Sequence, residues 1–383
     1  MNRILSLDVM RGVVIACMIL VNSPGTWDIH PMLCHASWIG LTPTDMMFPL
    51  FMFIMGITTY LSLKKYNFEF SWKIVLKIVK RAVLLCLCSY FICLFDHFCS
   101  YWFDTHEGVG VGQQIIDSLW VFPYLRYSGV LVRFAFCYAI ASILVLCFKH
   151  KYLPWVAAII LVGYFVTLLL GDGFNPDGTV NILGIVDQAV LGEAHMCNCN
   201  GMDPEGVLSS VPGIAHVLIG FCAGKMFLEQ LDKSNSSMLN ERLVKLAVLG
   251  FILIISGLLL HYGCGISKRI WSPTFVLFTC GCGCGILTVM TYFIDIKGSK
   301  FGTTFFRIFG QNPLFLYILS ECLFMFTMIM PIGEICLKDY ICQTLLLPWM
   351  PSMLASVIYA IMIVMACWLV GLVLYKKKII IRV

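Results

Sequence analysis

Long apolar runs alternate with short polar segments along the whole chain. The runs are continuous and do not alternate between apolar and polar every second residue, so they predict helices and not strands. A helix needs about 20 apolar residues to cross a bilayer, and the runs have that length. We expect ten spans, at residues 4–23, 43–63, 78–96, 129–148, 153–170, 207–228, 244–262, 271–294, 309–330 and 352–375.

Composition agrees with this pattern, because 60% of the 383 residues are hydrophobic and only 12% are charged. A soluble domain is roughly half apolar and a quarter charged. The predicted fold class is therefore all-α: a polytopic helical membrane protein with about ten transmembrane helices in a single domain over residues 1–383. The stretch Ile341–Pro348 is too short to span and is either re-entrant or interfacial.

The first run is expected to stay as a span and not to be a cleaved signal, since Asp8 and Arg11 interrupt it and no small-residue cleavage site follows. Lys and Arg gather in alternate loops, most densely at residues 64–81 and 376–382. The loop at residues 171–206 has six acidic residues and no Lys or Arg. By the positive-inside rule both termini are cytoplasmic. The net charge of +5 reflects this placement and indicates no nucleic-acid partner.

A histidine and two further polar residues are expected to meet at one outer mouth of the helix bundle. Asn22 ends the first span, His35 lies in the loop that follows, and Asp45 opens the second span. A neutral imidazole takes a proton from an amine near neutral pH, an aspartate fixes its tautomer, and an asparagine holds a carbonyl. Alternatively, His35 is an ordinary loop residue, with Asn22 and Asp45 as helix caps.

Several charged or polar side chains are predicted at membrane depth. Asp8 and Arg11 are three residues apart, so they either form an ion pair or mark a coenzyme entrance. Arg133 needs an anionic partner, for which Asp8, Glu321 and a ligand phosphate are candidates. Asn312 and Glu321 are the other polar residues at membrane depth, and a structural pairing with Arg133 is the simplest interpretation of them.

The outer loops add a second set of candidates. Asp203, followed by a proline and by Glu205, is either a helix start or a site for an amine or sugar hydroxyls. His216 is expected to be buried, either lining a cavity or bonded to a neighbouring helix. The loop with His195, Cys197 and Cys199 is a weak metal or disulfide candidate.

The remaining cysteine pattern does not indicate a disulfide framework. Most of the nineteen cysteines lie inside predicted spans, where a free cysteine behaves as a small hydrophobe. The "CGCGCG" stretch of residues 280–285 is interpreted as a small-residue packing stripe. Because two cysteines one residue apart lack the usual zinc spacing, no metal is expected.

Six segments together resemble one enzyme family. They are "SLDVMRGVVIACMILVN", "HASWIGLTPTDMMFPLFMFIMG", "GVLVRFAFCYAIA", "DPEGVLSSVPGIAHVLIG", "SKRIWSPTFVLFTCG" and "GQNPLFLYILSE". In this order they resemble the transmembrane acetyltransferase family of heparan-α-glucosaminide N-acetyltransferase, including its bacterial relatives. The resemblance covers nearly the whole chain, and the "HASWxGLT" pattern is its most specific part.

The resemblance implies transfer of an acetyl group from cytosolic acetyl-CoA to a glucosamine-type amine on the far side of the membrane. The family's active-site histidine matches His35, and its "VN" asparagine matches Asn22. Asp45 is the expected partner of His35. Coenzyme-binding candidates are Arg11, Arg133 and Asn312, and acceptor-binding candidates are Trp38, Asp203 and Glu205.

The motif begins within ten residues of Met1 as in bacterial members, so a bacterial cytoplasmic (inner) membrane is the expected location. The acceptor is expected to be an amino sugar or a glycan with a free amine. Direct transfer and an acetyl-histidine intermediate both stay open, as does a homodimer. The alternative function is an amino-sugar transporter, whose polar residues at depth would line a substrate path. No internal repeat supports that alternative.

Overall fold

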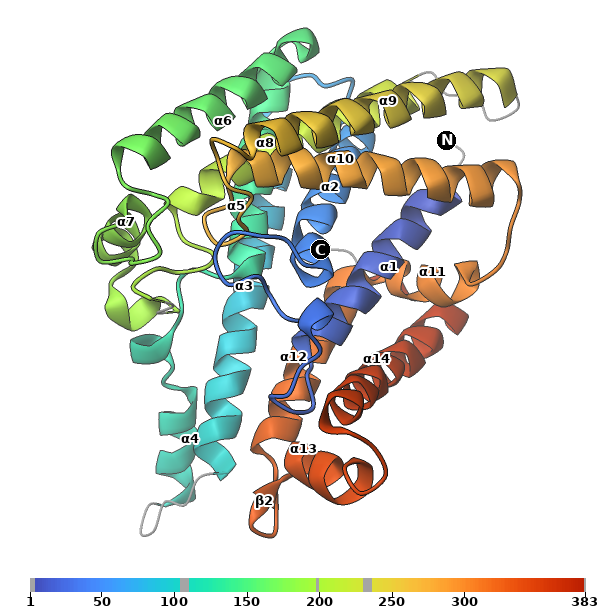
Figure 1. Cartoon of the computed structure of the whole chain (residues 1–383). Coiled ribbons are helices and arrows are strands. Elements are labelled where there is room, and N and C mark those ends of the chain that lie inside the picture. Colours follow the sequence, from blue (N-terminus) through green and yellow to red (C-terminus); the bar gives the residue numbers. More distant parts are fainter. Residues whose placement is uncertain (1–3, 104–109, 198–199, 230–235, 382–383) are drawn as a thin grey trace.

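The computed structural model describes residues 4–103, 110–197, 200–229 and 236–381. Its α-helices are α1 Leu5–Asn22, α2 Pro43–Lys64, α3 Trp72–Phe103, α4 Val111–Leu119, α5 Val130–Cys147, α6 Leu153–Leu170, α7 Ile182–Leu191, α8 Val211–Leu228, α9 Ser236–Leu260, α10 Pro273–Thr291, α11 Thr303–Gln311, α12 Pro313–Ile329, α13 Leu337–Asp339 and α14 Ser352–Lys376. One small antiparallel hairpin, β1 Pro331–Ile332 with β2 Ile335–Cys336, follows α12. Figure 1 shows the helices packed side by side and the hairpin at one end.

The predicted membrane fold is confirmed. Within the described residues, nine helices are long and apolar enough to cross a bilayer, and a bent pair makes up to ten. The central helices α1, α2 and α8 are largely buried by their neighbours, whereas α3 and α9 lie outside them. The hydrophobic window of α8 is 72% buried, against 11% for α3. The core therefore forms around α1, α2 and α8, and the outer helices leave apolar faces for lipid.

The predicted span at residues 309–330 differs from the structure at its N-terminal end. Residues 313–329 form α12, whereas residues 309–311 belong to α11, which meets α12 at an angle of 86°. Pro313 cannot donate a backbone hydrogen bond, and it also disfavours helical geometry in the preceding residue. Asn312 accordingly has φ −128° and ψ 55°, outside the helical region. Its buried amide donates to the carbonyl of Ile379 at 3.1 Å and accepts from the N–H of Ile381 at 2.8 Å, which ties the C-terminal segment to the bend.

The third span is longer than the predicted residues 78–96, because α3 runs from Trp72 to Phe103. The stretch Ile341–Pro348 is not among the helices long enough to span, as predicted, and residues 341–346 belong to π-helical turns over Tyr340–Leu346. The two short outer helices α4 and α7 carry loop residues that the apolar pattern left unassigned.

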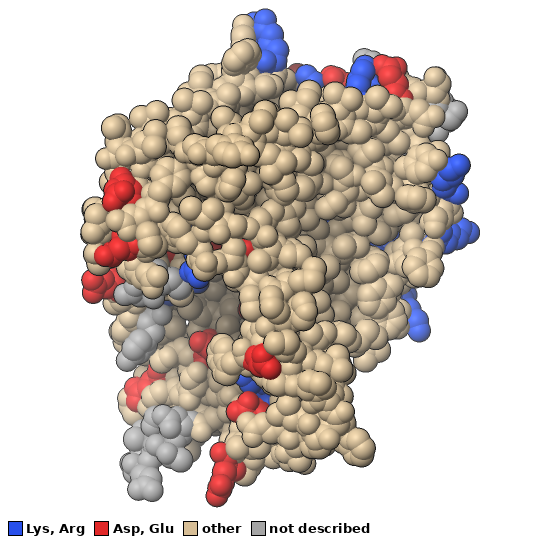
Figure 2. All heavy atoms as spheres, viewed as in Figure 1, with Lys and Arg blue, Asp and Glu red and all other residues tan. Residues whose placement is uncertain are grey.

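Charged side chains are distributed unevenly over the molecule. On the face drawn in Figure 2, Lys and Arg gather along the upper and right edges, and Asp and Glu gather at the left and lower left. The acidic region lies over the loops around α7 and α4 in Figure 1. This separation agrees with the alternation of charge along the sequence, and the positive-inside rule predicts that the basic end is cytoplasmic.

Helix α1 contacts α11 with almost no side chain between them. A Cβ added at Gly12 would overlap the backbone carbonyl of Phe306, and a Cβ at Gly310 would overlap that of Asp8. Glycine is required at both positions because only a missing side chain permits this approach. The contact sets the position of α1, and through it the position of Asn22 at its end.

We expect Gly12→Ala to lower the free energy of unfolding by about 1–3 kcal/mol, because the added methyl group must push α1 and α11 apart. Thermal unfolding in detergent measures the change. Gly163→Ala in α6 is the matched control, since nothing lies within 4 Å of a Cβ there. A similar loss in both variants, or in neither, would contradict the explanation.

Candidate active site

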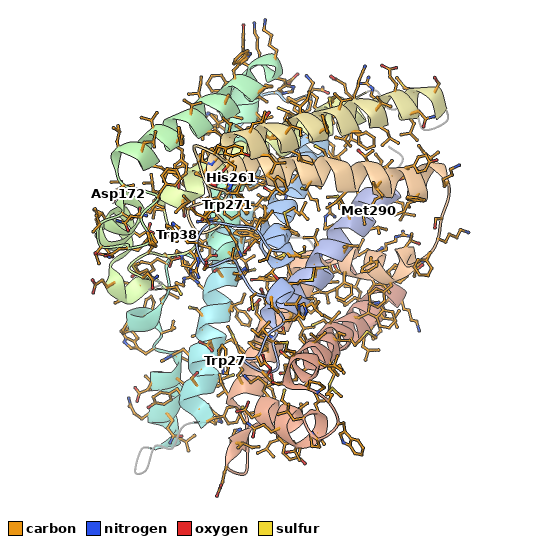
Figure 3. All side chains as sticks on the ribbon, in the orientation of Figure 1. Trp27, Trp38, Asp172, His261, Trp271 and Met290 are labelled. Carbon is orange, nitrogen blue, oxygen red and sulfur yellow. The ribbon has the colours of Figure 1, made fainter. Side chains whose placement is uncertain are left out.

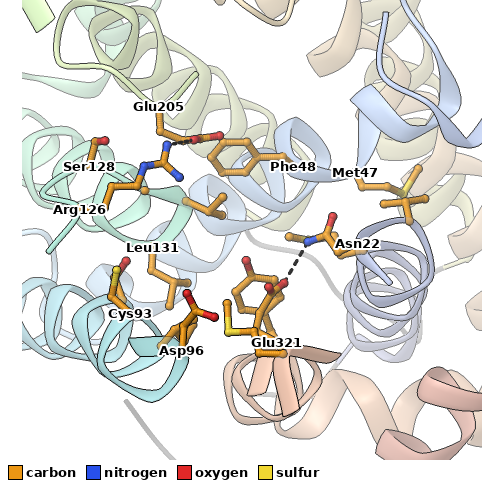
Figure 4. A pocket seen from close by; sticks show the side chains of 18 of the residues that line it. Asn22, Met47, Phe48, Cys93, Asp96, Arg126, Ser128, Leu131, Glu205 and Glu321 are labelled. Carbon is orange, nitrogen blue, oxygen red and sulfur yellow. Dashed lines mark hydrogen bonds and ion pairs between the residues drawn. The ribbon is translucent and has the colours of Figure 1, made fainter. Parts of the chain in front are cut away.

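A cavity of about 370 Å³ lies at the acidic end of the bundle. It is lined by residues of α1, α2, α3, α5 and α12 and by loop residues that include His35, Arg126, Glu205 and Lys268. Figure 4 shows Arg126 and Glu205 on one wall, Asp96 and Glu321 on the opposite wall, and Asn22 at the right, joined to Glu321. We call this space the outer cavity.

His35 is held at the outer cavity by Asp45. The ring Nδ1 lies 2.7 Å from Asp45 Oδ1. Asp45 Oδ2 accepts the backbone N–H groups of Ala36 and Thr42, both at 3.1 Å, and the carboxylate is only 1% exposed. A carboxylate at Nδ1 favours the tautomer with its proton on that atom. Nε2 then carries the lone pair that can accept a proton.

Asp45 is at the same time part of the start of α2. Thr42 is the N-cap residue, and its side chain and that of Asp45 form a reciprocal capping box. The geometry therefore agrees with both interpretations of Asp45: it caps the start of α2, and it is placed to fix the tautomer of His35. The predicted meeting of Asn22, His35 and Asp45 at one mouth is confirmed, while their chemical roles stay predictions.

Asn22 is bonded across the outer cavity to a residue that the sequence placed elsewhere. Its Nδ2 donates to Glu321 Oε1 at 3.1 Å (Figure 4). Glu321 comes from α12, so this bond joins the first and last helices that line the cavity. The second acidic side chain on this wall is that of Asp96 in α3. The sequence indicated only that Asp96 lies at the end of a predicted span.

Arg126, Asp203 and Glu205 form one network on the opposite wall. Arg126 donates to both oxygens of Asp203, at 2.5 and 3.1 Å, and to Glu205 at 2.6 Å. Asp203 also accepts from the Ser128 hydroxyl at 2.5 Å and from the Cys197 N–H at 2.7 Å. Although burial opposes ionisation, these donors keep the pKa of Asp203 below its usual value. The carboxylate is thus occupied with holding the loop.

The three predicted acceptor-binding residues are therefore separated. Glu205 lines the outer cavity. Trp38 and Asp203 instead line a small neighbouring hollow of about 40 Å³. The Trp38 indole donates to the carbonyl of Phe174 at 2.8 Å, which turns the ring toward the loops between α6 and α7 (Figure 3).

Arg133 has partners that the sequence did not indicate. Its guanidinium donates to Ser210 Oγ at 3.1 Å, to the carbonyl of Pro204 at 3.0 Å and to the hydroxyl of Ser209. It lies 4.9 Å from the centre of the Trp271 ring. The predicted pairing with Asp8 or Glu321 is wrong, because the guanidinium is bonded to the loop before α8 instead.

The expected helix start at Asp203 is also wrong. Asp203 closes a turn by accepting the N–H of Glu205 at 2.8 Å, and α8 begins only at Val211, after a short 3₁₀ turn. His216 lies inside α8 and is fully buried. Its ring is 6.1 Å from that of Trp271, and it lines none of the cavities described here.

A second cavity, of about 380 Å³, lies at the basic end. Arg11, Arg81, Gln311 and Ile381, which lies near the C-terminus, are among its lining residues. We call it the inner cavity. The predicted ion pair of Arg11 with Asp8 is confirmed at 3.7 Å. Among the described residues that line the two cavities, neither Arg133 nor Asn312 is found.

Among the described residues, Leu131 of α5 alone lines both cavities. The rings of Phe48 and Phe134 meet edge to face beside it, with centres 4.8 Å apart, and Phe51 lies 4.9 Å from Phe134. Phe48 lines the outer cavity, and Phe51 and Phe134 line the inner one. The two spaces are therefore separated by a thin apolar wall of these four side chains.

Sequence reasoning left out Lys268, which contacts His35. Its Nζ lies 3.2 Å from Nδ1 and 3.4 Å from Nε2 of the ring, and 3.7 Å from Asp45 Oδ1. Lys268 was visible in the sequence as a cation on the side of the membrane where acids prevail. Nothing in the spacing of 233 residues indicated which side chain it would meet.

The predicted metal or disulfide loop has other contacts. His195 Nδ1 lies 2.9 Å from the carbonyl of Leu125, and its ring stacks on Tyr127 at 4.1 Å. Cys199 lies outside the described residues. Over the part of the chain that the structure describes, no three His, Cys, Asp or Glu side chains are grouped for a metal ion.

Comparison with known proteins agrees with the resemblance seen in the motifs. A family model described as a domain of unknown function (DUF5009) matches residues 3–129. The mouse protein named heparan-alpha-glucosaminide N-acetyltransferase is 26% identical over 376 residues, which cover 84% of this chain and 54% of the mouse protein. The human protein of that name is 25% identical over 373 residues, with 83% and 53% covered. The chain spans about half the length of these curated relatives.

The loop that carries Asp203 and Glu205 rests on a second buried carboxylate, that of Asp187 in α7. Asp187 accepts the N–H of Val207 at 2.9 Å and that of Asp203 at 3.3 Å. A Cβ at Gly206 would overlap this carboxylate, so the loop needs glycine there. Burial raises the pKa of Asp187 to about 6, against an ordinary value of 3.8.

Between pH 3.8 and about 6, the Asp187 carboxyl is protonated in the folded protein and ionised in the unfolded protein. Folding therefore takes up a proton in this range, and stability rises as the pH falls. We therefore expect wild type to gain stability relative to Asp187→Asn as the pH is lowered from about 7 to about 4.5. The measurement is the difference in unfolding temperature between the two proteins in detergent across this range. A difference that stays constant with pH would contradict the assignment.

Proposed function

We propose that this protein is a transmembrane acetyltransferase, which moves the acetyl group of cytosolic acetyl-CoA to the amine of an amino sugar on the opposite side of the membrane. The observation that carries the proposal is the pair of cavities at opposite ends of the bundle with one shared wall at Leu131. One end offers guanidinium groups, and the other offers a histidine oriented by a carboxylate. The names of the curated relatives support the same chemistry.

The inner cavity is the proposed donor site. Arg11 and Arg81 line it, and guanidinium groups suit the phosphates of a coenzyme. Arg11 and Asn22 are eleven residues apart on α1, or about 16 Å at the rise of an α-helix. An extended thioester arm inserted past Leu131 would cross that distance. Asn312 contributes indirectly, because it fixes the C-terminal segment whose Ile380 and Ile381 line this cavity.

The outer cavity is the proposed site of reaction. The acceptor nitrogen attacks the acetyl carbonyl carbon, the carbon–sulfur bond breaks, and coenzyme A leaves as a thiol. His35 Nε2 takes the proton that the nitrogen loses and passes it to the departing sulfur, so that protons balance. Asn22 orients the reacting carbonyl or the amine. The carboxyl groups of Asp96 and Glu321 on one wall, with Glu205 on the other, attract a cationic amine.

Trp38 and Asp203 take supporting positions in this proposal. They hold the loops on either side of the mouth, and a larger glycan acceptor would extend over them from the outer cavity. Arg133 stabilises the loop that carries Glu205 by donating a hydrogen bond to the carbonyl of Pro204. The basic end faces the cytoplasm by the positive-inside rule, and the proposed location is a bacterial inner membrane.

We expect His35→Ala to lower the rate of acetyl transfer to an amino sugar by at least about a hundredfold, since a positioned general base contributes that much or more. The assay uses purified protein in vesicles, with labelled acetyl-CoA on the basic side and glucosamine on the other. Stabilisation by acetyl-CoA in thermal unfolding should be kept, because His35 lies outside the donor cavity.

The matched control is His30→Ala, an exposed histidine in the same loop that is not among the cavity residues. Full activity of His35→Ala would refute the assignment of the base. Sugar uptake by wild-type vesicles without acetyl-CoA, together with no acetyl transfer, would favour the transporter instead.

We also expect Leu131→Trp to reduce acetyl transfer at least about tenfold while acetyl-CoA still stabilises the protein. A larger ring in the shared wall fills the passage between the cavities but leaves the Arg11 end open. Leu131→Met, which conserves volume, serves as the control. Normal transfer by a folded Leu131→Trp protein would exclude a passage at this position.

A further inference from the structure

Lys268 is the cation in contact with His35, and its geometry is unusual for a simple hydrogen bond. Its Nζ is nearly equidistant from the two ring nitrogens, at 3.2 and 3.4 Å. The Cε1–H group lies between those nitrogens at the ring edge. A position in the ring plane at these two distances would therefore overlap Cε1. The ammonium group must lie over the face of the imidazole ring.

The loop between α9 and α10 holds Lys268 in this place. The carbonyl of Ile266 accepts the N–H of Gly40 at 2.8 Å, which joins this loop to the one that carries His35. Ile266 in turn donates its N–H to His261 Nδ1 at 3.0 Å. Trp271 is fully buried and adopts φ +50°, a backbone conformation that residues other than glycine and asparagine seldom adopt. Strain of this kind persists only where packing enforces it.

The packing that enforces it is at the floor of the outer cavity. The Trp271 ring lies 5.0 Å from that of Phe48 and 4.9 Å from the Arg133 guanidinium. Lys268 is three residues earlier, and its carbonyl accepts the Trp271 N–H at 3.1 Å. The Lys268 side chain is only 22% exposed. It is therefore a built feature of the site and not a mobile surface lysine.

Two charges of opposite sign act on the His35 ring. Asp45, from α2, favours the protonated ring, and Lys268, from the α9–α10 loop, favours the neutral ring. Among the described residues, four other acidic or basic side chains line the cavity. Arg126 and Glu205 are bonded to each other, and Asp96 and Glu321 lie on the opposite wall. Burial lowers the pKa of Lys268, while Asp45 and Glu205 act to raise it.

We propose that Lys268 is a positioning residue for His35: its ammonium group, fixed over the ring, keeps the imidazole neutral while Asp45 holds the tautomer. The in-plane lone pair of Nε2 then stays open to the outer cavity and can take a proton from an acceptor amine. The proposal rests on the proposed function for its chemical meaning. Its electrostatic part concerns His35 alone and is measurable without any acceptor.

The test compares Lys268→Met, which removes the charge and keeps the chain length, with Lys268→Arg, which keeps the charge. Diethyl pyrocarbonate acylates only the neutral imidazole, so the rate of His35 modification, followed by peptide mass spectrometry, reports its protonation as a function of pH. In Lys268→Met we expect the midpoint to move about one pH unit upward or more, since a cation at this distance is removed. In Lys268→Arg the midpoint should stay near that of wild type.

Lys245→Met is the control for net charge, because Lys245 is an exposed residue of α9 paired with Glu241. Its midpoint should not move. If Lys268→Met does not fold, Lys268→Gln replaces it. An unchanged midpoint in the neutral variant, or an equal shift in Lys268→Arg, would overturn the proposal.

Acetyl transfer supplies a second readout. Loss of kcat/KM in Lys268→Met should be about tenfold near or below neutral pH and should largely recover at alkaline pH, whereas a structural defect would persist at every pH. If the midpoint shifts but wild type transfers no acetyl group, the proposed function fails and the role of Lys268 stands. If wild type transfers acetyl groups and the midpoint does not shift, only the role of Lys268 fails.

Discussion

The geometry of the site depends on the hydrogen bonds that the Asp45 carboxylate accepts. One of its oxygens bonds His35, and the other accepts the N–H groups of Ala36 and Thr42. A single buried group thus starts α2, folds the preceding loop back over the helix end and orients the imidazole. Because an unpaired carboxylate is costly away from water, the loop residues that satisfy it cannot move independently of the helix. His35 is therefore fixed to the rigid core of the bundle although it belongs to a loop.

The rest of the site is built by bringing other helix ends to this point. Close backbone contact of α1 with α11 places Asn22, and α12 brings Glu321 to within hydrogen-bond distance of it. Asp187 supports the loop that delivers Glu205. Close-packed apolar side chains around Leu131 separate this outer space from the basic inner one. The proposed function needs such a wall, since an open path between the two sides would also pass ions.

Several elements were predictable because their cause is local. The apolar runs specify helices at membrane depth, since the bilayer leaves the backbone no other way to satisfy its hydrogen bonds. The capping pattern of Thr42 and Asp45 is visible within four consecutive positions. The bend at Asn312 was equally local, because the Asn–Pro pair in "GQNPLF" indicates a helix boundary, yet the predicted span of residues 309–330 begins before it. The meeting of Asn22, His35 and Asp45 followed from the short connection between the first two spans.

Contacts between distant segments could not be read in this way. Lys268 reaches His35 across 233 residues, and Arg133 turns to Ser209 and Ser210 where a charged partner was expected. Trp38 belongs to the most specific motif in the chain, yet its indole is bonded to Phe174, away from the outer cavity. The sequence by itself determined the helices, the likeness to an acetyltransferase family and the residues at one mouth. Only the tertiary structure decided which charges meet, because helix packing in three dimensions sets those distances and chain spacing does not.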